Sequence, residues 1–150
     1  MSYQEKNITV SLVSHLLIVS YYLVSLFQML REGGLNSARL FGLWAIVIAA
    51  TIIVNIIATI LTNIVLTIVE AIKAQKYEEP RFIEDERDKL IGLKGTRSAY
   101  ITFSAGVMVS VLAFAFGQPA LVMIGLIIFF SIAADVIGDI SQIYLYRRGL

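Results

Sequence analysis

Two aspartates, Asp135 and Asp139, stand one helical turn apart in the apolar segment SIAADVIGDISQI near the C-terminus. A charged side chain at the centre of a bilayer costs at least about 2.5–3.5 kcal/mol, and acids at membrane depth are usually functional. Two carboxylates this close repel each other, which favours a proton on one of them. Carboxylate oxygens also bind cations. The pair therefore predicts a site that binds a proton or a small cation.

Other polar residues are expected at the same depth in the membrane. In the apolar run 40–69, every fourth residue from position 51 to position 67 is Thr or Asn, which makes one slanting stripe on a helix. This stripe would supply neutral ligands, and a histidine seven residues into the first apolar run would relay or sense protons. The alternative is that the stripe only hydrogen-bonds between helices. The predicted cation- or proton-binding residues are Asp135, Asp139, Asn55, Thr59, Asn63 and His15.

The composition of the chain is typical of a membrane protein. Its 150 residues are 58% hydrophobic and 15% charged, against about 45–50% and about 25% in soluble domains. A helix crosses the hydrocarbon core with about 20 mostly apolar residues. Four segments satisfy this rule, at 8–30, 40–69, 99–116 and 120–146. We therefore predict an all-α integral membrane protein, a single domain in which four transmembrane helices form an antiparallel bundle.

The distribution of basic residues predicts the orientation. Four spans place both termini and the connection 70–98 on one side of the membrane, together with ten of the 12 Lys and Arg residues. The positive-inside rule makes that side cytoplasmic. We expect a multi-pass protein of the cell (inner) membrane whose N- and C-termini are both cytoplasmic. Since four short spans enclose little volume, we also expect a homo-oligomer.

The connection between the second and third spans is the only long charged stretch. We predict that residues 77–98 form a cytoplasmic interfacial helix or loop that leads into the third span. The candidate residues for docking a cytoplasmic partner are Asp85, Glu86, Arg87 and Asp88. A charged helix face that pairs within the chain is the alternative. A divalent cation on these carboxylates is a third, less favoured interpretation.

The sequence EDERDKLIGLKGTRSAY, followed by an apolar span, resembles an uncharacterised group of small four-helix inner-membrane proteins of bacteria or archaea. These proteins have a similar Asp-Glu-Arg-Asp/Glu motif before the third span. The matching residues are Asp85, Glu86, Arg87, Asp88, Ile91, Lys94, Arg97, Ala99 and Tyr100. The resemblance covers residues 84–116, and beyond them only the number of spans. It implies the four-span topology and a bacterial or archaeal membrane, and it assigns no activity.

Several classes of function are excluded or disfavoured. The chain has no cysteine and one histidine, and its net charge of +1 argues against nucleic-acid binding. It has no nucleophile turn, no H-E-x-x-H and no phosphate loop, so we expect neither enzyme activity nor a cofactor. Two hypotheses follow. The first is a small cation- or proton-coupled transporter or channel that uses Asp135 and Asp139. The second is a non-transporting membrane regulator or scaffold that presents residues 78–97 to a cytoplasmic partner.

Overall fold

The computed structural model describes residues 3–74 and 86–148, with side chains for 5–53, for 56, 57, 60, 64 and 68, and for 86–148. The described residues form four α-helices and no strand, which confirms the all-α prediction. The helices are α1 (Tyr3–Arg31), α2 (Ser37–Ala74), α3 (Glu86–Ala115) and α4 (Ala120–Arg147).

Two short turns fold the helices into the hairpins α1–α2 and α3–α4. Gly33, Gly34 and Gly117 have φ values of 122°, 106° and 90°, a region that glycine adopts without steric cost. The Asn36 side chain accepts hydrogen bonds from two backbone N–H groups in the first turn of α2, at 2.9 and 3.3 Å, as a helix cap does. Pro119 directly precedes α4. Each turn therefore follows from residues that stop one helix and start the next.

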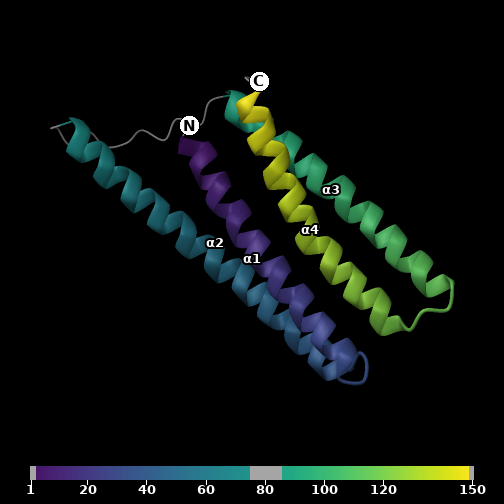
Figure 1. Cartoon of the computed structure of the whole chain (residues 1–150). Helices are drawn as coiled ribbons and strands as arrows, with labels where there is room; N and C mark the ends of the chain where they lie inside the picture. The colour runs from purple at the N-terminus through teal and green to yellow at the C-terminus, as the bar shows by residue number, and fades with distance from the viewer. Residues whose placement is uncertain (1–2, 75–85, 149–150) are drawn as a thin grey trace.

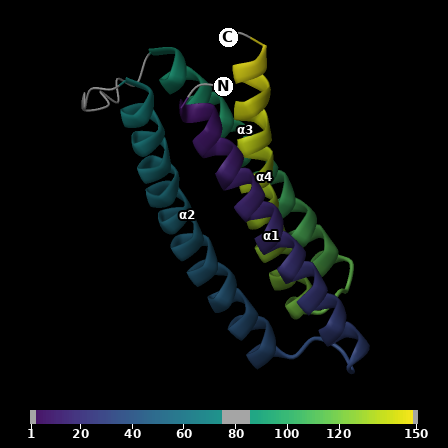
Figure 2. The ribbon, with the colours of Figure 1, turned by 60° about the vertical axis from the view of Figure 1, so that its left-hand side comes forward.

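The helices lie in the spatial order α2, α1, α4, α3, and neighbours run in opposite directions (Figures 1 and 2). The most extensive helix–helix interface is between α3 and α4, and α1 packs against both α4 and α2. Both termini lie at one end of the molecule and the two turns lie at the other (Figure 1). This order places α1 beside α4, although they are the first and last helices of the chain.

Three helices contain segments that are long and apolar enough to cross a membrane. These segments are Glu5–Arg31, Glu86–Ala115 and Ala120–Arg147. The part of α2 with continuously described side chains, Ser37–Ile53, is apolar but shorter than a span. Large apolar side chains are exposed along the helices, which suits a hydrocarbon environment. The prediction of helices long and apolar enough to cross a membrane is therefore confirmed for three of the described helices.

The described part of the predicted interfacial segment is continuous with the predicted third span. Residues 86–98 are the first half of one continuous helix, α3, which runs through Gly92 and Gly95 to Ala115. Gly95 is buried and lies against the side chain of Gln142 on α4, so packing on α4 maintains the helix where glycine alone would weaken it. Residues 77–85, the rest of the predicted interfacial segment, lie outside the described residues.

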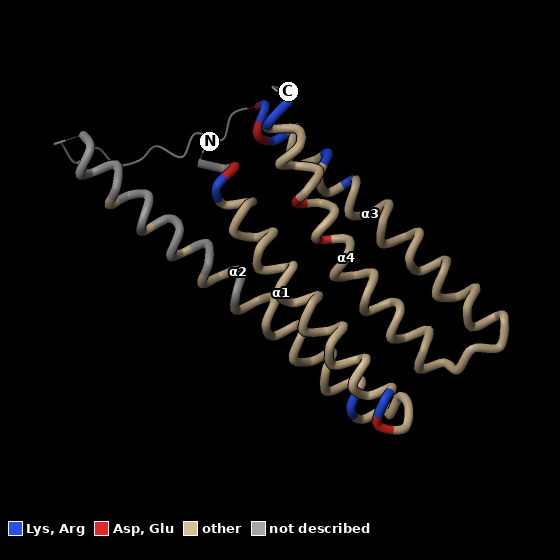
Figure 3. The backbone as a smooth tube through the Cα atoms, in the orientation of Figure 1, with Lys and Arg blue, Asp and Glu red and all other residues tan. Residues whose placement is uncertain are grey.

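The charged residues lie mainly at the two ends of the described helices, and two acidic positions interrupt the apolar middle of α4 (Figure 3). A buried apolar cluster lies between these acids and the turns. Its members come from α1, α2 and α4: Ile18, Tyr22, Leu40, Leu43, Val47, Ile128 and Ile132. Within it the Tyr22 hydroxyl donates a 2.7 Å hydrogen bond to the carbonyl oxygen of Gly125. This cluster fixes the α1–α4 interface that carries the candidate site.

Candidate functional site

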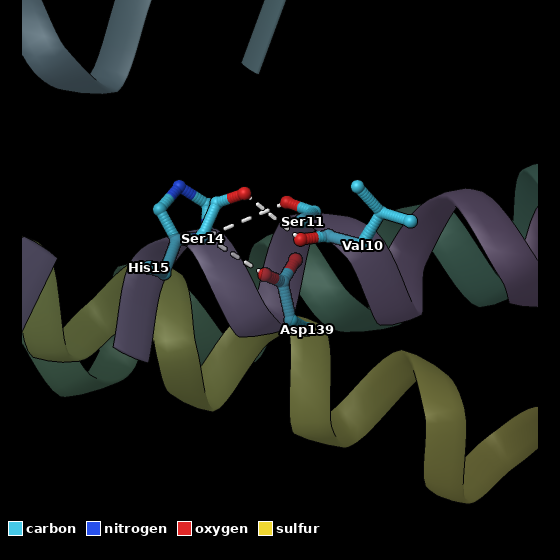
Figure 4. Close-up of polar contacts among 5 residues, drawn as sticks. All are labelled: Val10, Ser11, Ser14, His15 and Asp139. Atoms are coloured by element: carbon cyan, nitrogen blue, oxygen red, sulfur yellow. Dashed lines mark hydrogen bonds and ion pairs between the residues drawn. The ribbon is translucent and has the colours of Figure 1, made fainter. Parts of the chain in front are cut away.

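A histidine of α1 meets an aspartate of α4 inside the helix interface (Figure 4). His15 Nδ1 lies 2.8 Å from Asp139 Oδ2, although 124 positions separate the two residues. His15 is 6% exposed and Asp139 is 8% exposed. The Ser11 hydroxyl lies 3.4 Å from the same imidazole nitrogen. The structure thus brings two of the six predicted site residues into direct contact.

The spacing of buried residues explains why these side chains meet. On α1, His15, Ile18 and Tyr22 follow one another at three and four residues, so they share one face. On α4, Ile132 and Asp139 are seven residues apart and share the face that packs on α1. The Tyr22 hydroxyl adds a hydrogen bond to Gly125 of α4, seven residues from His15 on α1 and 14 residues from Asp139 on α4. The apolar core therefore holds the imidazole against the carboxylate.

The buried pair can hold a proton in more than one state. A neutral imidazole with its proton on Nδ1 donates to the Asp139 carboxylate, and a second proton on Nε2 converts the pair into an imidazolium–carboxylate ion pair. A single buried charge would be costly, while a paired one is tolerated. The contact therefore provides a place where a proton can bind and leave within the apolar part of the molecule.

Asp135 does not take part in the His15–Asp139 contact. It is exposed, and it lines a recess of about 170 Å³ between α2 and α4, together with Thr51 of the polar stripe. The sequence predicts one site between the second and fourth spans for both aspartates, whereas the structure directs Asp139 to α1 and Asp135 to the recess. Two residues four positions apart point about 40° away from each other around a helix. Because α1 and α2 both lie beside α4, this rotation is enough to turn Asp139 toward α1 and Asp135 toward α2.

The remaining ligands predicted from the polar stripe are Asn55, Thr59 and Asn63. The backbone is helical at all three positions. Their side chains lie outside the part of the chain that the structure describes, so their role as ligands stays a prediction. Thr51, the first residue of the stripe, donates a hydrogen bond to the carbonyl oxygen of Val47 at 2.9 Å.

The predicted docking residues lie at the start of α3. Asp85 is outside the described residues, and Glu86 is exposed at the first position of the helix. Asp88 accepts a 2.7 Å hydrogen bond from the Tyr146 hydroxyl on α4. The Arg87 guanidinium donates to the Tyr146 carbonyl oxygen at 3.4 Å and lies 5.9 Å from the centre of its ring. Arg87 and Asp88 therefore join α3 to the end of α4.

The sequence does not predict two further polar contacts between the helices. Glu5 of α1 lies 3.7 Å from the Arg147 guanidinium of α4, and the Glu5 side chain is only 12% exposed. The hydroxyls of Ser98 and Ser141 lie 3.0 Å apart between α3 and α4. The sequence places Glu5 and Arg147, which have opposite charges, at the same predicted end of the first and fourth spans, and this could have predicted the first contact. Small polar residues in apolar helices were the signal for the second.

Neither a protein-family model, nor a curated protein, nor a solved structure matches this chain. Among the residues that the structure describes, no group of three or more His, Cys, Asp or Glu side chains is arranged to hold a metal ion. The chemistry of the site is therefore inferred from the His15–Asp139 pair and from the recess beside Asp135.

Proposed function

We propose that this protein is a small multi-pass protein of a cell (inner) membrane that moves protons or small cations, and that His15 and Asp139 form its proton-binding centre. The observation that carries the proposal is the 2.8 Å contact between two buried, ionisable side chains of α1 and α4. Ionisable residues at membrane depth are costly and usually mark ion or proton pathways.

Three ionisable residues follow α4 along its axis toward the C-terminus. Asp135 lies one turn, roughly 6 Å, from Asp139, and Arg147 lies roughly 12 Å beyond Asp139. Arg147 in turn contacts Glu5 at the end of α1. A proton that enters at the exposed Asp135 would reach the His15–Asp139 pair and then the charged end of the molecule. In this proposal His15 relays the proton and Asp139 stabilises the imidazolium.

The orientation and the number of spans are part of the proposal. At 1.5 Å per residue, the 38 residues of α2 make roughly 57 Å of helix, which is long enough to act as the fourth span. The two termini lie at the same end as the charged start of α3 (Figure 3), and the positive-inside rule places that end in the cytoplasm. The resemblance of residues 84–116 to small four-helix inner-membrane proteins favours the same topology. A homo-oligomer completes the proposal, because four spans alone enclose little volume.

The alternative of a regulator that presents residues 78–97 has less support. Arg87 and Asp88 are engaged with Tyr146 inside the chain, and an interaction surface would have to release these contacts first.

Proton movement can be tested in proteoliposomes that contain the purified protein and a pH-sensitive dye. Under a potassium diffusion potential, we expect the wild-type protein to conduct protons. His15→Gln and Asp139→Asn keep the size of each side chain but remove its proton chemistry. Each should lower the rate at least about tenfold, since positioned acids and bases typically contribute at least that factor to proton transfer.

The matched control for this experiment is Tyr22→Phe. It removes a hydrogen bond from the same α1–α4 interface, between Tyr22 and Gly125, without changing any charge. We expect its rate to stay within about twofold of wild type, because a neutral hydrogen bond contributes little net stability. If Tyr22→Phe loses as much flux as Asp139→Asn, or if all three variants conduct like wild type, the pair is not a proton-binding centre.

The proposed topology can be tested by cysteine labelling, because the native chain has no cysteine. Gln118→Cys places a thiol in the α3–α4 turn, and Lys89→Cys places one at the opposite end of α3. In intact cells, a membrane-impermeant maleimide should label Gln118→Cys and should reach Lys89→Cys only after permeabilisation. The reverse pattern would contradict cytoplasmic termini.

A further inference from the structure

The recess between α2 and α4 has an acidic end, and none of the described residues that line it is basic. Among the described side chains, Asp135 is the only charged one that lines the recess. None of the hydrogen bonds or ion pairs formed among the described residues involves the Asp135 carboxylate. The nearby His15 is bonded to Asp139. Since an ionised carboxylate at membrane depth is costly, a bound cation would stabilise this end of the recess.

The two hydroxyl groups that line the recess add acceptors. Thr51 donates its hydroxyl proton to the carbonyl oxygen of Val47 at 2.9 Å, and Ser131 donates its own to that of Ile128 at 2.7 Å. Each oxygen keeps acceptor capacity after its proton is committed. With Asp135, the polar side chains of the recess therefore present acceptors. An ammonium group is their complement, because it has three donors and no acceptor.

The apolar part of the recess extends away from these acceptors. Trp44 is seven residues before Thr51, roughly 10 Å along α2. The wall between them includes Val47 and Ile132, which belong to the buried core cluster. The volume of about 170 Å³ is below the roughly 300–1,000 Å³ of pockets for drug-sized ligands. The recess thus suits a short, elongated molecule with its charge at one end.

We propose that this recess binds a short primary alkylammonium ion. The ammonium group donates to Asp135, Thr51 and Ser131, and the alkyl chain lies along the apolar wall toward Trp44. An inorganic cation would leave the apolar length unfilled, and a lipid chain would leave the carboxylate uncompensated. The inference names a substrate class for the proposed function. Transport of an alkylammonium ion rests on the proposed function, whereas binding of the ion to the recess is tested separately.

Trp44 makes this binding site directly observable. It is the only tryptophan in the chain, so the protein's tryptophan emission comes from a wall of the recess. We expect n-hexylammonium chloride, titrated into the full-length protein in a non-ionic detergent, to change this emission in a saturable way. Hexan-1-ol has the same chain and no charge, and it should give no saturable change.

Three variants assign the response to the acidic end. Asp135→Asn should weaken the apparent affinity at least about tenfold, because it removes a charge-assisted hydrogen bond. Thr51→Val keeps the side-chain shape and removes one acceptor, and it should weaken the affinity by about threefold to tenfold. Glu32→Gln removes the same charge at the α1–α2 turn, where Glu32 pairs with Arg39, and should leave the affinity unchanged. If Asp135→Asn does not fold, the affinity of Thr51→Val for n-hexylammonium still tests whether the acceptors hold the ligand.

Three results would overturn the inference. An equal response to hexan-1-ol would mean apolar partition only. An unchanged affinity in Asp135→Asn or Thr51→Val would mean that the acceptors do not hold the ligand. A response that sodium chloride reproduces would mean an inorganic cation site. Absence of proton flux with intact binding would contradict the proposed function alone, and flux without binding would contradict this inference alone.

Discussion

Replacing His15 by leucine is expected to lower the free energy of unfolding by about 3–5 kcal/mol. The substitution leaves the buried Asp139 carboxylate without the imidazole that lies 2.8 Å away, and removal of one partner from a buried pair typically has a cost of this size. The double variant His15→Leu/Asp139→Leu removes both polar groups and should recover most of the loss. Unfolding of wild type, both single variants and the double variant in detergent, followed by circular dichroism, gives the coupling energy directly.

Ser20→Ala is the control for this cycle. The Ser20 hydroxyl is exposed on α1 and bonds only to the carbonyl oxygen of Leu16 among the described residues, so the change should stay within about 0.5 kcal/mol. A double variant that is less stable than either single variant would show that the pair is not a coupled unit. If the double variant folds but does not conduct protons, the pair is required for function and dispensable for the fold.

The second large effect is expected at Gly106, where α3 crosses α4. Gly106 is buried, and a Cβ atom there would overlap Cβ and Cγ of Phe130. These atoms are close to the α4 backbone and cannot move away independently. Overpacking of this kind typically costs about 1–3 kcal/mol, so Gly106→Ala should destabilise the α3–α4 hairpin. Resistance to denaturation in a graded series of sodium dodecyl sulfate concentrations measures the effect.

Gly92→Ala is the matched control on the same helix. A Cβ atom at Gly92 meets nothing within 4 Å, so only the helix propensity changes, and the variant should be about 0.5–1 kcal/mol more stable. Opposite signs for the two glycines are the expected outcome. Equal tolerance at both would show that α3 does not pack on Phe130 as described.

Much of the helical framework follows from local sequence. The run 40–69 lies within α2 because apolar residues continue past the cap at Asn36, and the Gly-Gly and Gly-Gln-Pro sequences end helices where the turns occur. Counting 1.5 Å per residue also places His15 near the level of Asp139. Helix ends and the depth of a residue along its helix depend on distance along one helix, which a sequence specifies directly.

Which face of each helix packs against which neighbouring helix could not be predicted in the same way. Whether Asp139 faces α1 or α2 depends on the spatial order of the helices, and four similarly apolar segments do not encode that order locally. The separation of Asp135 from Asp139 needs both the order and the rotation of α4. The contact between Tyr146 and Asp88 joins the ends of two helices, where an interfacial tyrosine would equally well face lipid headgroups.

The neighbouring positions of the first and last helices have a consequence for biosynthesis. His15 leaves the ribosome 124 residues before Asp139, which corresponds to roughly 6–25 s of translation. In the proposed topology the imidazole, which carries no charge in one of its ordinary forms, enters the membrane during this time, ahead of its acid. The aspartate, whose ionised form is the costlier one to insert, arrives last and finds its partner already in place. The order of synthesis thus places the residue that needs a partner after the residue that provides it.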